Sequence, residues 1–99
     1  MGSECIFCQI ISGQLPANIE YQDEKVVAFR DIHPKAKFHL LIVPKKHVLD
    51  IASADASLLT SILAIIKKFK VSDYKIEING GSLQEVKHLH VHLLSERGL

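Results

Sequence analysis

The sequence has little net charge, few cysteines and no long hydrophobic run. Its 12 basic and 11 acidic side chains leave a formal net charge of +1, so the chain lacks the broad basic surface of a nucleic-acid-binding protein. Two cysteines in 99 residues are too few for a disulfide scaffold. The longest apolar run, residues 62–66, is far below the ~20 residues of a membrane span. Glu4 and the absence of an apolar segment after it are unlike a signal peptide. We therefore expect a cytoplasmic protein with neither nucleic acid nor membrane as a partner.

Length and hydrophobic content indicate one small domain with more apolar surface than its own core needs. A chain of 99 residues is well below the size at which proteins split into domains. We therefore expect a single domain over residues 1–99. Hydrophobic residues make up 47% of the chain, which is generous for this length. That surplus points to a partner surface, most simply a second copy of the chain.

The spacing of apolar residues and turn signals predicts an α+β fold. A short N-terminal helix is expected over residues 5–12, because Gly13 and Pro16 follow it. Strands are expected over 19–21, 25–30, 38–43, 74–79 and 87–94. Since the early strands follow one another with short connections, we expect an antiparallel sheet of about five strands.

One long helix is predicted over residues 54–69. Ser53 is a plausible N-cap, Asp55 lies in the first turn, and Lys67 and Lys68 lie in the last. The apolar side chains of this helix fill an arc of about 160°, wider than the ~100° stripe that one sheet face needs. A two-fold dimer is the simplest source of a second partner for the helix. The alternative is a helix covered by loops of its own chain.

Three histidines alternate along the last predicted strand. Alternate side chains share one face of a strand, so His88, His90 and His92 would lie together, with neighbours roughly 6.5 to 7 Å apart. Such a row can share a metal ion. It can also act as nucleophile and proton carrier, because the ordinary pKa of imidazole, ~6.5, lies near neutral pH. A histidine-rich face without a function is the remaining interpretation.

Two cysteines near the start are spaced as Cys-x-x-Cys. In a reduced compartment this spacing, at Cys5 and Cys8, indicates a metal site or a redox pair. A redox pair of the thioredoxin type would follow a strand, and no strand is predicted before Cys5. The remaining interpretations are a metal site and two free thiols.

The alternating histidine motif is shared with a known family. The run His88-Leu89-His90-Val91-His92-Leu93-Leu94 resembles the signature of the histidine triad (HIT) family of nucleotide hydrolases and transferases, and in particular its nucleoside phosphoramidate hydrolase-like branch. The likeness covers most of the chain and includes residues 5–11, Pro16, 28–32, 39–47 and 84–87. It implies a HIT-like fold for the sheet and helices predicted above.

The resemblance implies a role for each matching residue. His90 matches the nucleophile that attacks the α-phosphate of a nucleotide, His92 a histidine that contacts the phosphate, and His88 the first member of the triad. His39 matches a fourth histidine beside them. Asp31 matches a carboxylate that holds the ribose hydroxyls, an ordinary turn residue being the alternative. The residues that match the family's apolar clamp around the base are Ile6, Phe7, Ile10, Phe29 and Ile32. Those that match the phosphate and leaving-group side are Asn79, Gln84 and Glu85.

The resemblance also gives the cysteine pair a function. Some relatives hold a structural zinc ion through such a pair and two histidines, and the matching residues here are Cys5, Cys8, His47 and His88. Catalysis in the family needs no cofactor. His33 matches no functional position, and we expect it to be a solvated loop residue.

The activity implied is cleavage of nucleoside 5′-phosphoramidates or adenylates at the α-phosphate, through a covalent nucleotidyl-histidine at His90. A purine nucleotide is the expected substrate and a homodimer the expected assembly. Residues 79–84 form a shorter loop than in the family, and the chain after the triad is short. Alternatives are a dinucleoside polyphosphate hydrolase, a catalytically weak nucleotide-binding regulatory module, and a protein whose histidines mainly bind metal.

Overall fold

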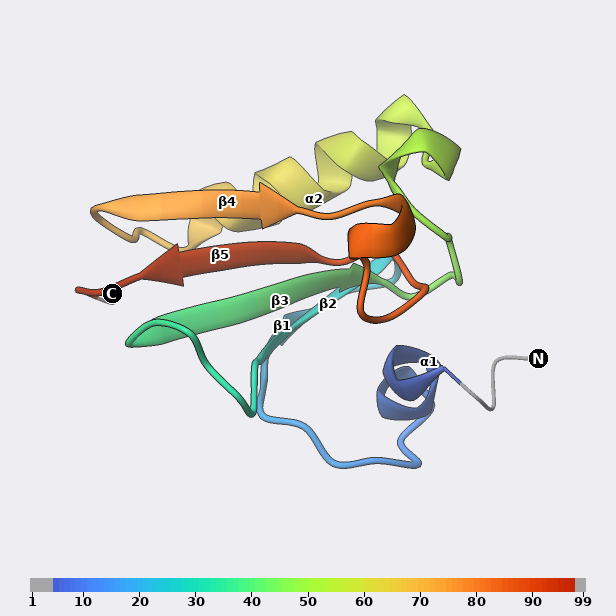
Figure 1. The fold of residues 1–99 in the computed structure, drawn as a ribbon, viewed down its shortest axis with the longest axis horizontal. Helices are drawn as coiled ribbons and strands as arrows, with labels where there is room; N and C mark the ends of the chain where they lie inside the picture. The colour runs from blue at the N-terminus through green and yellow to red at the C-terminus, as the bar shows by residue number, and fades with distance from the viewer. Residues whose placement is uncertain (1–4, 98–99) are drawn as a thin grey trace.

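The computed structural model describes residues 5–97 as a five-stranded antiparallel sheet with one helix on each face (Figure 1). The helices are α1 (Ile6–Ile11) and α2 (Ala56–Lys68), and two 3-10 turns, η2 (Ile51–Ser53) and η3 (Gly81–Leu83), lie in the connections. The strands, in the spatial order β1-β2-β3-β5-β4, are β1 (Ile19–Gln22), β2 (Val26–Arg30), β3 (Phe38–Pro44), β5 (Val91–Ser95) and β4 (Tyr74–Ile78). The predicted α+β class, the antiparallel sheet and both helices are confirmed.

The core lies between the sheet and α2. Every residue of β3 is buried, which is why its sequence reads as a continuous apolar run. One set of alternate side chains from the central strands, with Leu40 and Leu93 at its centre, packs against Ile62 and Ile65 of α2. Full burial of an aliphatic side chain contributes roughly 1.5–3 kcal/mol, so this layer carries most of the stability. None of the helices in residues 5–97 is long and apolar enough to span a bilayer.

A second, smaller layer forms where α1 covers the other face of the sheet. Phe7 is its centre and packs edge-on against Phe29, with ring centroids 5.7 Å apart. Val27, Leu41 and Val43 complete this cluster. Beyond them, the same face continues onto β5 and β4 with His92 and Glu77, which are paired across the two strands. The polar part of this face adjoins the apolar pocket that α1 creates.

Two boundaries, the start of α2 and the start of β5, differ from those predicted by two residues or more. Helix α2 is capped by Asp55, whose Oδ1 accepts the Leu58 N–H at 2.8 Å, and Ser53 instead ends the turn η2. The prediction of Ser53 as N-cap is therefore wrong. Ser53 is engaged by Asp50, whose carboxylate accepts from both its backbone N–H and its hydroxyl. The carboxylates of Asp50 and Asp55 thus cap two successive elements, η2 and α2.

The last strand begins later than predicted. The sheet ladder starts at Val91, so His88 and His90 precede it in a segment without regular secondary structure. This segment forms other bonds: the His88 ring bonds to the Pro44 carbonyl at 2.8 Å, and the N–H of Leu89 donates to Val48 at 2.7 Å. Residues 88–90 are therefore attached to the end of β3 and the chain after it.

Candidate active site and metal centre

Five of the six histidines lie in two adjoining clusters around the start of β5. His90 and His92 border a hollow beneath α1, and His39 is bonded to His92 behind them, whereas His47 and His88 lie with the two cysteines. The predicted triad is therefore divided: its first member turns toward the cysteines and the other two toward the hollow. The rings of His90 and His92 are edge-to-face, with centroids 5.0 Å apart.

The tautomer of His90 is set by the backbone. Its Nδ1 lies 2.7 Å from the carbonyl oxygen of His88, and because a carbonyl only accepts, Nδ1 carries the proton. The lone pair of the neutral ring is therefore on Nε2. The ring is 5% exposed and packs against the edge of Phe7, with centroids 5.0 Å apart. This arrangement leaves one nucleophilic nitrogen in a fixed orientation at the hollow.

A chain of hydrogen bonds also sets the tautomers of His39 and His92. The backbone N–H of Lys35 donates to Nδ1 of His39 at 3.1 Å, so the proton of neutral His39 is on Nε2. That Nε2–H donates to Nδ1 of His92 at 2.8 Å. The proton of neutral His92 is consequently on Nε2, which can donate to a bound anion. His92 can thus act as a hydrogen-bond donor while His90 keeps a free lone pair.

Burial keeps this pair of histidines neutral. Desolvation is the main cause that lowers the pKa of His39, although the nearby Asp31 carboxylate, 3.5 Å from its Nε2, acts in the opposite direction. Desolvation also lowers the pKa of His92, and the rings of His90 and His39 lower it further. Glu77 and Asp31 oppose that shift. At neutral pH both rings are therefore uncharged hydrogen-bonding groups.

The hollow beside these histidines has a volume of about 570 Å³ and is mostly apolar. It contains His90 and His92 together with most of the residues predicted to bind the nucleotide, namely Ile6, Phe7, Ile10, Phe29, Asp31, Ile32 and Glu85. A pocket of this size and character, with a few polar groups at one side, is typical of small-molecule sites. The sequence missed further lining residues, which are Leu15, Pro16, Ala17, Arg30, His33, Leu41 and Val86.

Gln84 lies elsewhere, contrary to the prediction. It is buried, its Nε2 donates to the Leu49 carbonyl at 2.7 Å, and it does not line the hollow. Its Oε1 is buried without a hydrogen-bond partner among the described residues. Asn79, half-buried after β4, is also not among the lining residues. The cause is the loop between them: it turns at Gly81, which has φ of +61°, into η3, and this turn carries the Gln84 side chain toward Leu49.

His33 is an exposed loop residue, as predicted, and it also lines the hollow. The loop after β2 folds around Asp31, whose Oδ1 accepts the N–H of His33 at 2.9 Å. The backbone N–H of Asp31 donates to the His39 carbonyl at 3.0 Å, and this bond fixes the Asp31 carboxylate beside the hollow. The sequence signal was the Asp-x-His spacing, because Asp side chains often accept the N–H two residues on.

The second cluster brings together the four predicted metal ligands. Cys5 Sγ lies 3.3 Å from His88 Nδ1, and Cys8 Sγ lies 3.2 Å from His47 Nδ1 and 3.6 Å from His88 Nδ1. All four ligand atoms lie within 4.8 Å of one another. Tetrahedral zinc, with bonds of ~2.3 Å to sulfur and ~2.0–2.1 Å to nitrogen, places such atoms roughly 3.5 Å apart. The donor set and its spacing therefore fit zinc.

The surroundings of His88 also suit a metal ligand. Its Nε2 lies 2.8 Å from the Pro44 carbonyl, so Nε2 carries the proton and the Nδ1 lone pair points toward the cysteines. This bond is the usual orienting contact of a ligating histidine. Burial is the main cause that lowers the pKa of His88 and raises the pKa of Cys8. Burial thus favours the ligating form of His88 and opposes thiolate formation at Cys8, which a bound cation would reverse.

Comparison with known proteins agrees with this geometry. The family model described as "Scavenger mRNA decapping enzyme C-term binding" matches residues 4–98. An uncharacterised HIT-like protein of Methanocaldococcus jannaschii is 39% identical, over 91% of this chain and 77% of its own.

Solved structures agree as well. A HIT family hydrolase of Legionella pneumophila Philadelphia 1 is 39% identical, with a TM-score of 0.82 over 92% of this chain and 91% of its own. A histidine triad protein of Clostridium difficile is 36% identical, with a TM-score of 0.87 over 98% of this chain and 94% of its own. With these matches and its divided cluster of histidines, the chain belongs to the histidine triad (HIT) family.

Proposed function

We propose that the protein is a nucleotide hydrolase or transferase that cleaves nucleoside 5′-phosphoramidates or adenylates at the α-phosphate. The observation that carries this proposal is the bond between His90 Nδ1 and the His88 carbonyl, which leaves the Nε2 lone pair at the edge of an apolar hollow. The hydrolase name of the similar Legionella protein supports the reaction class.

The hollow suits a purine nucleotide. Ile6, Ile10 and Phe29 offer apolar surface to a flat base. The Asp31 carboxylate, held by the N–H of His33, can accept hydrogen bonds from two ribose hydroxyls. The α-phosphate would then lie between His90 and His92, whose Nε2–H stabilises the phosphate charge.

The chemistry follows from these two rings. The Nε2 lone pair of His90 attacks phosphorus and forms a P–N bond, while the bond to the leaving amine breaks and its electron pair leaves with the amine, which takes up a proton. Water then attacks the nucleotidyl-histidine, breaks the new P–N bond and releases the nucleoside monophosphate. Two displacements replace one difficult step. The reaction needs no cofactor.

The second cluster is proposed to hold a structural zinc ion through Cys5, Cys8, His47 and His88. When bound, zinc supplies a cross-link and no redox chemistry. It would join the start of α1 to the segment that carries His90, because His88 provides a ligand through its ring and an acceptor to His90 through its carbonyl.

The chain is proposed to act as a homodimer of single-domain subunits. The exposed large hydrophobic residues include Leu63 of α2 and three residues of β4. Leu63 is 56% exposed, so loops of its own chain do not cover this part of α2. This favours a second subunit over the alternative of a helix wrapped by its own loops.

A test of the reaction is AMP release from adenosine 5′-phosphoramidate, compared between wild type, His90→Ala and His90→Gly with added imidazole. We expect His90→Ala to lower kcat/KM by about 10³-fold or more, as for other nucleophile substitutions. Imidazole should partly restore His90→Gly, because it replaces the missing side chain. Intact-mass measurement during turnover should detect one nucleotidyl group on the wild type and none on His90→Ala.

One observation favours a second candidate function. The Gln84 amide is engaged with Leu49 rather than with the hollow, which removes a predicted contact on the phosphate side. A wild type that binds AMP as tightly as His90→Ala but releases none from phosphoramidates would identify a nucleotide-binding regulatory module. Turnover of diadenosine polyphosphates but not of phosphoramidates would instead identify the dinucleoside polyphosphate hydrolase.

A further inference from the structure

A second hollow lies on the same face of the sheet as His92, toward the end of β5. Its volume is about 340 Å³, and it is lined by the loop between β2 and β3, by β4 and by the end of β5. Glu77 lines this hollow and is directly opposite His92, which lines the hollow beneath α1. Directly opposite residues have Cβ atoms about 4.5–5.5 Å apart. The two hollows therefore meet at the pair of Glu77 and His92.

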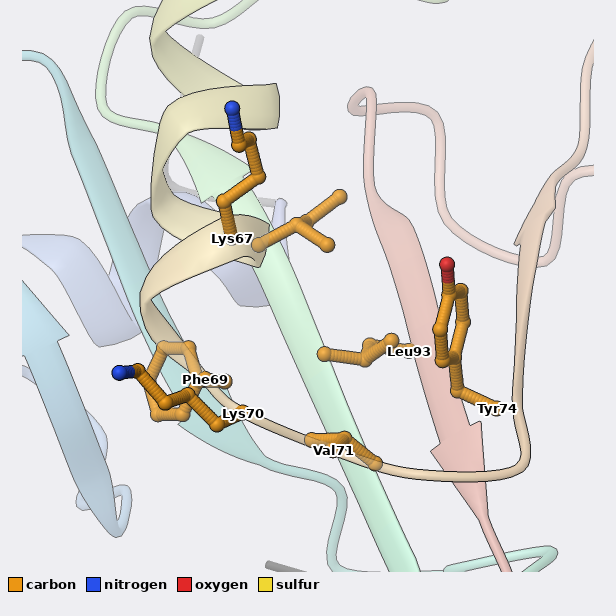
Figure 2. Close-up of a pocket in the computed structure, with 7 residues that line it drawn as sticks. Lys67, Phe69, Lys70, Val71, Tyr74 and Leu93 are labelled. Atoms are coloured by element: carbon orange, nitrogen blue, oxygen red, sulfur yellow. The ribbon is translucent and has the colours of Figure 1, made fainter.

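The other face of β4 has a different character. Ile76 is paired with Leu93, a core residue of the α2 layer, so Ile76 and its alternate neighbours lie on the helix side. Figure 2 shows Tyr74 and Leu93 there, beside a separate hollow of about 260 Å³ whose charged lining residues are lysines. Lys75 and Glu77 lie on the α1 face instead. The carboxylate of β4 is thus on the face that carries His92.

The direction of in-line attack leads into the second hollow. In such a displacement the leaving group departs from phosphorus on the side opposite the nucleophile. With His90 as the nucleophile and His92 as a hydrogen-bond donor to the phosphate, that side lies beyond His92 along β5. The next residue of β5 on this face is Leu94, which also lines the second hollow. The leaving group of a bound nucleotide would therefore lie beside Glu77.

The carboxylate of Glu77 is available to a bound group. Glu77 is exposed, and among residues 5–97 no ion pair or hydrogen bond engages its carboxylate. Desolvation and the neighbouring imidazoles lower the pKa of His92, and the charged side chains that oppose this shift are Glu77 and Asp31. Asp31 already accepts the N–H of His33 and is the proposed ribose ligand. Glu77 therefore places a free negative charge beside the uncharged His92 ring.

We infer that Glu77 is a specificity-determining residue that selects substrates whose leaving group carries a positively charged amine. A carboxylate attracts such a group and repels the anionic leaving group of a dinucleoside polyphosphate. Lys75 is opposite Leu94, so this cation of β4 lies one alternate position further from His92, roughly 6.5–7 Å along the strand. The inference rests on the proposed function and narrows its substrate class to phosphoramidates and adenylates with a cationic leaving group.

The test compares three adenosine 5′-phosphoramidates that differ in the charge of the N-substituent, which is aminopropyl, butyl or carboxypropyl. We expect Glu77→Gln to lower kcat/KM for the aminopropyl substrate and to raise it for the carboxypropyl substrate, each by about fivefold, the size expected for one exposed charge pair. The butyl substrate should change by less than about twofold. Glu77→Lys should reverse the wild-type order. The intrinsic reactivity of each substrate is the same with every variant and cancels in these ratios.

Glu24→Gln is the matched control, since Glu24 is exposed in the turn between β1 and β2, at the other edge of the sheet. It should leave all three values unchanged. A merely structural role for Glu77 would change kcat/KM for the three substrates by one common factor, and that result would overturn the inference. So would a wild type that prefers the carboxypropyl substrate or does not distinguish the three.

A binding measurement separates this inference from the proposed function. His90→Ala should turn over none of the three compounds, so calorimetry can measure their dissociation constants in this variant with and without Glu77→Gln. The aminopropyl compound should bind about fivefold tighter than the butyl compound when Glu77 is present, and the two should bind equally in the double variant. If the wild type releases no AMP but shows this preference, the hydrolase proposal fails and the inference stands. Turnover without any preference means the reverse, and absence of binding overturns both.

Discussion

Main-chain groups set the tautomers of His90 and His39. The His88 carbonyl accepts from His90 Nδ1, and the Lys35 N–H donates to His39 Nδ1. A main-chain partner cannot be removed by a side-chain substitution, so the tautomers are stable features of the fold. His92 is the exception, because its tautomer depends on the His39 side chain alone.

This dependence gives a prediction for His39. In His39→Gln the amide can accept from Lys35 and donate to His92, which preserves the chain, whereas His39→Leu can do neither. We expect His39→Leu to lower kcat/KM for a phosphoramidate by about 10- to 100-fold, the range for loss of a group that orients a functional histidine. His39→Gln should stay within about fivefold of the wild type. Equal losses in steady-state assays of the two variants would contradict the proposed hydrogen-bond chain.

At the scale of the element, the two helices stabilise the molecule by different means. Helix α2 begins at the N-cap Asp55 and buries Ile62 and Ile65 in the main core. Helix α1 has only six residues, which is too short to be stable alone. It is fixed by Phe7 at its inner face and by the cysteine and histidine cluster at its start.

For α2, Ile62→Ala should lower the free energy of unfolding by about 2–5 kcal/mol, as expected for a large-to-small change in a tight core. Leu63→Ala, one residue further along, should cost less than about 1 kcal/mol in the dissociated subunit, because Leu63 is 56% exposed there. Urea unfolding of both variants at a protein concentration below the dimer dissociation constant measures the difference. Similar losses under these conditions would contradict the exposure of Leu63 in the single subunit.

For α1, we expect zinc to be bound at one ion per chain in protein purified without an affinity tag. Cys5→Ser or Cys8→Ser should abolish that zinc, and the thermal midpoint should fall by about 10 °C, since ~2 kcal/mol corresponds to such a shift in a domain of this size. Gln14→Ala, in the exposed turn after α1, is the control and should keep the metal. Wild-type protein that contains no metal, or whose midpoint is unchanged by a chelator, would refute this proposal.

Most elements could be predicted from the sequence, because apolar spacing and turn residues act locally. The buried run of β3 and the helical spacing of α2 are examples. The start of β5 could not be predicted, since residues 88–90 bond to Pro44 and Val48, which are distant in the sequence. The orientation of Gln84 likewise depends on a turn at Gly81 and an acceptor at Leu49. Family resemblance supplied most of the residues of the hollow, but it did not predict this local path of the chain.

At the scale of the whole molecule, one irregular segment connects the two histidine clusters. Residues 88–90 attach to the end of β3, contribute His88 to the cysteine cluster and direct His90 into the hollow. Phe7 of α1 contacts both of these rings, with centroids 5.9 and 5.0 Å away. The cysteine and histidine cluster, the short helix and His90 therefore form one packed unit on the α1 face of the sheet.

The same burial makes the stability of the molecule depend on pH. The pKa values of His39 and His92 are lowered, mainly by desolvation, with Asp31 and Glu77 acting against the shift and Lys35 and the neighbouring imidazoles adding to it. The folded protein therefore binds fewer protons than the unfolded chain once the pH falls below ~6.5. The stabilisation is fully present above that value and is lost as the pH falls through the lowered pKa values.

We accordingly expect the free energy of unfolding, measured in urea, to decrease between pH 7.5 and 5.5, before the carboxylates titrate. The decrease should be smaller in His39→Gln, which removes one of the two buried rings while keeping the hydrogen bonds and the metal ligands. Because both proteins share the cysteine cluster, any effect of pH on metal binding is common to them and cancels in the comparison. Identical slopes for the two proteins would show that His39 takes up its proton without opposing the fold.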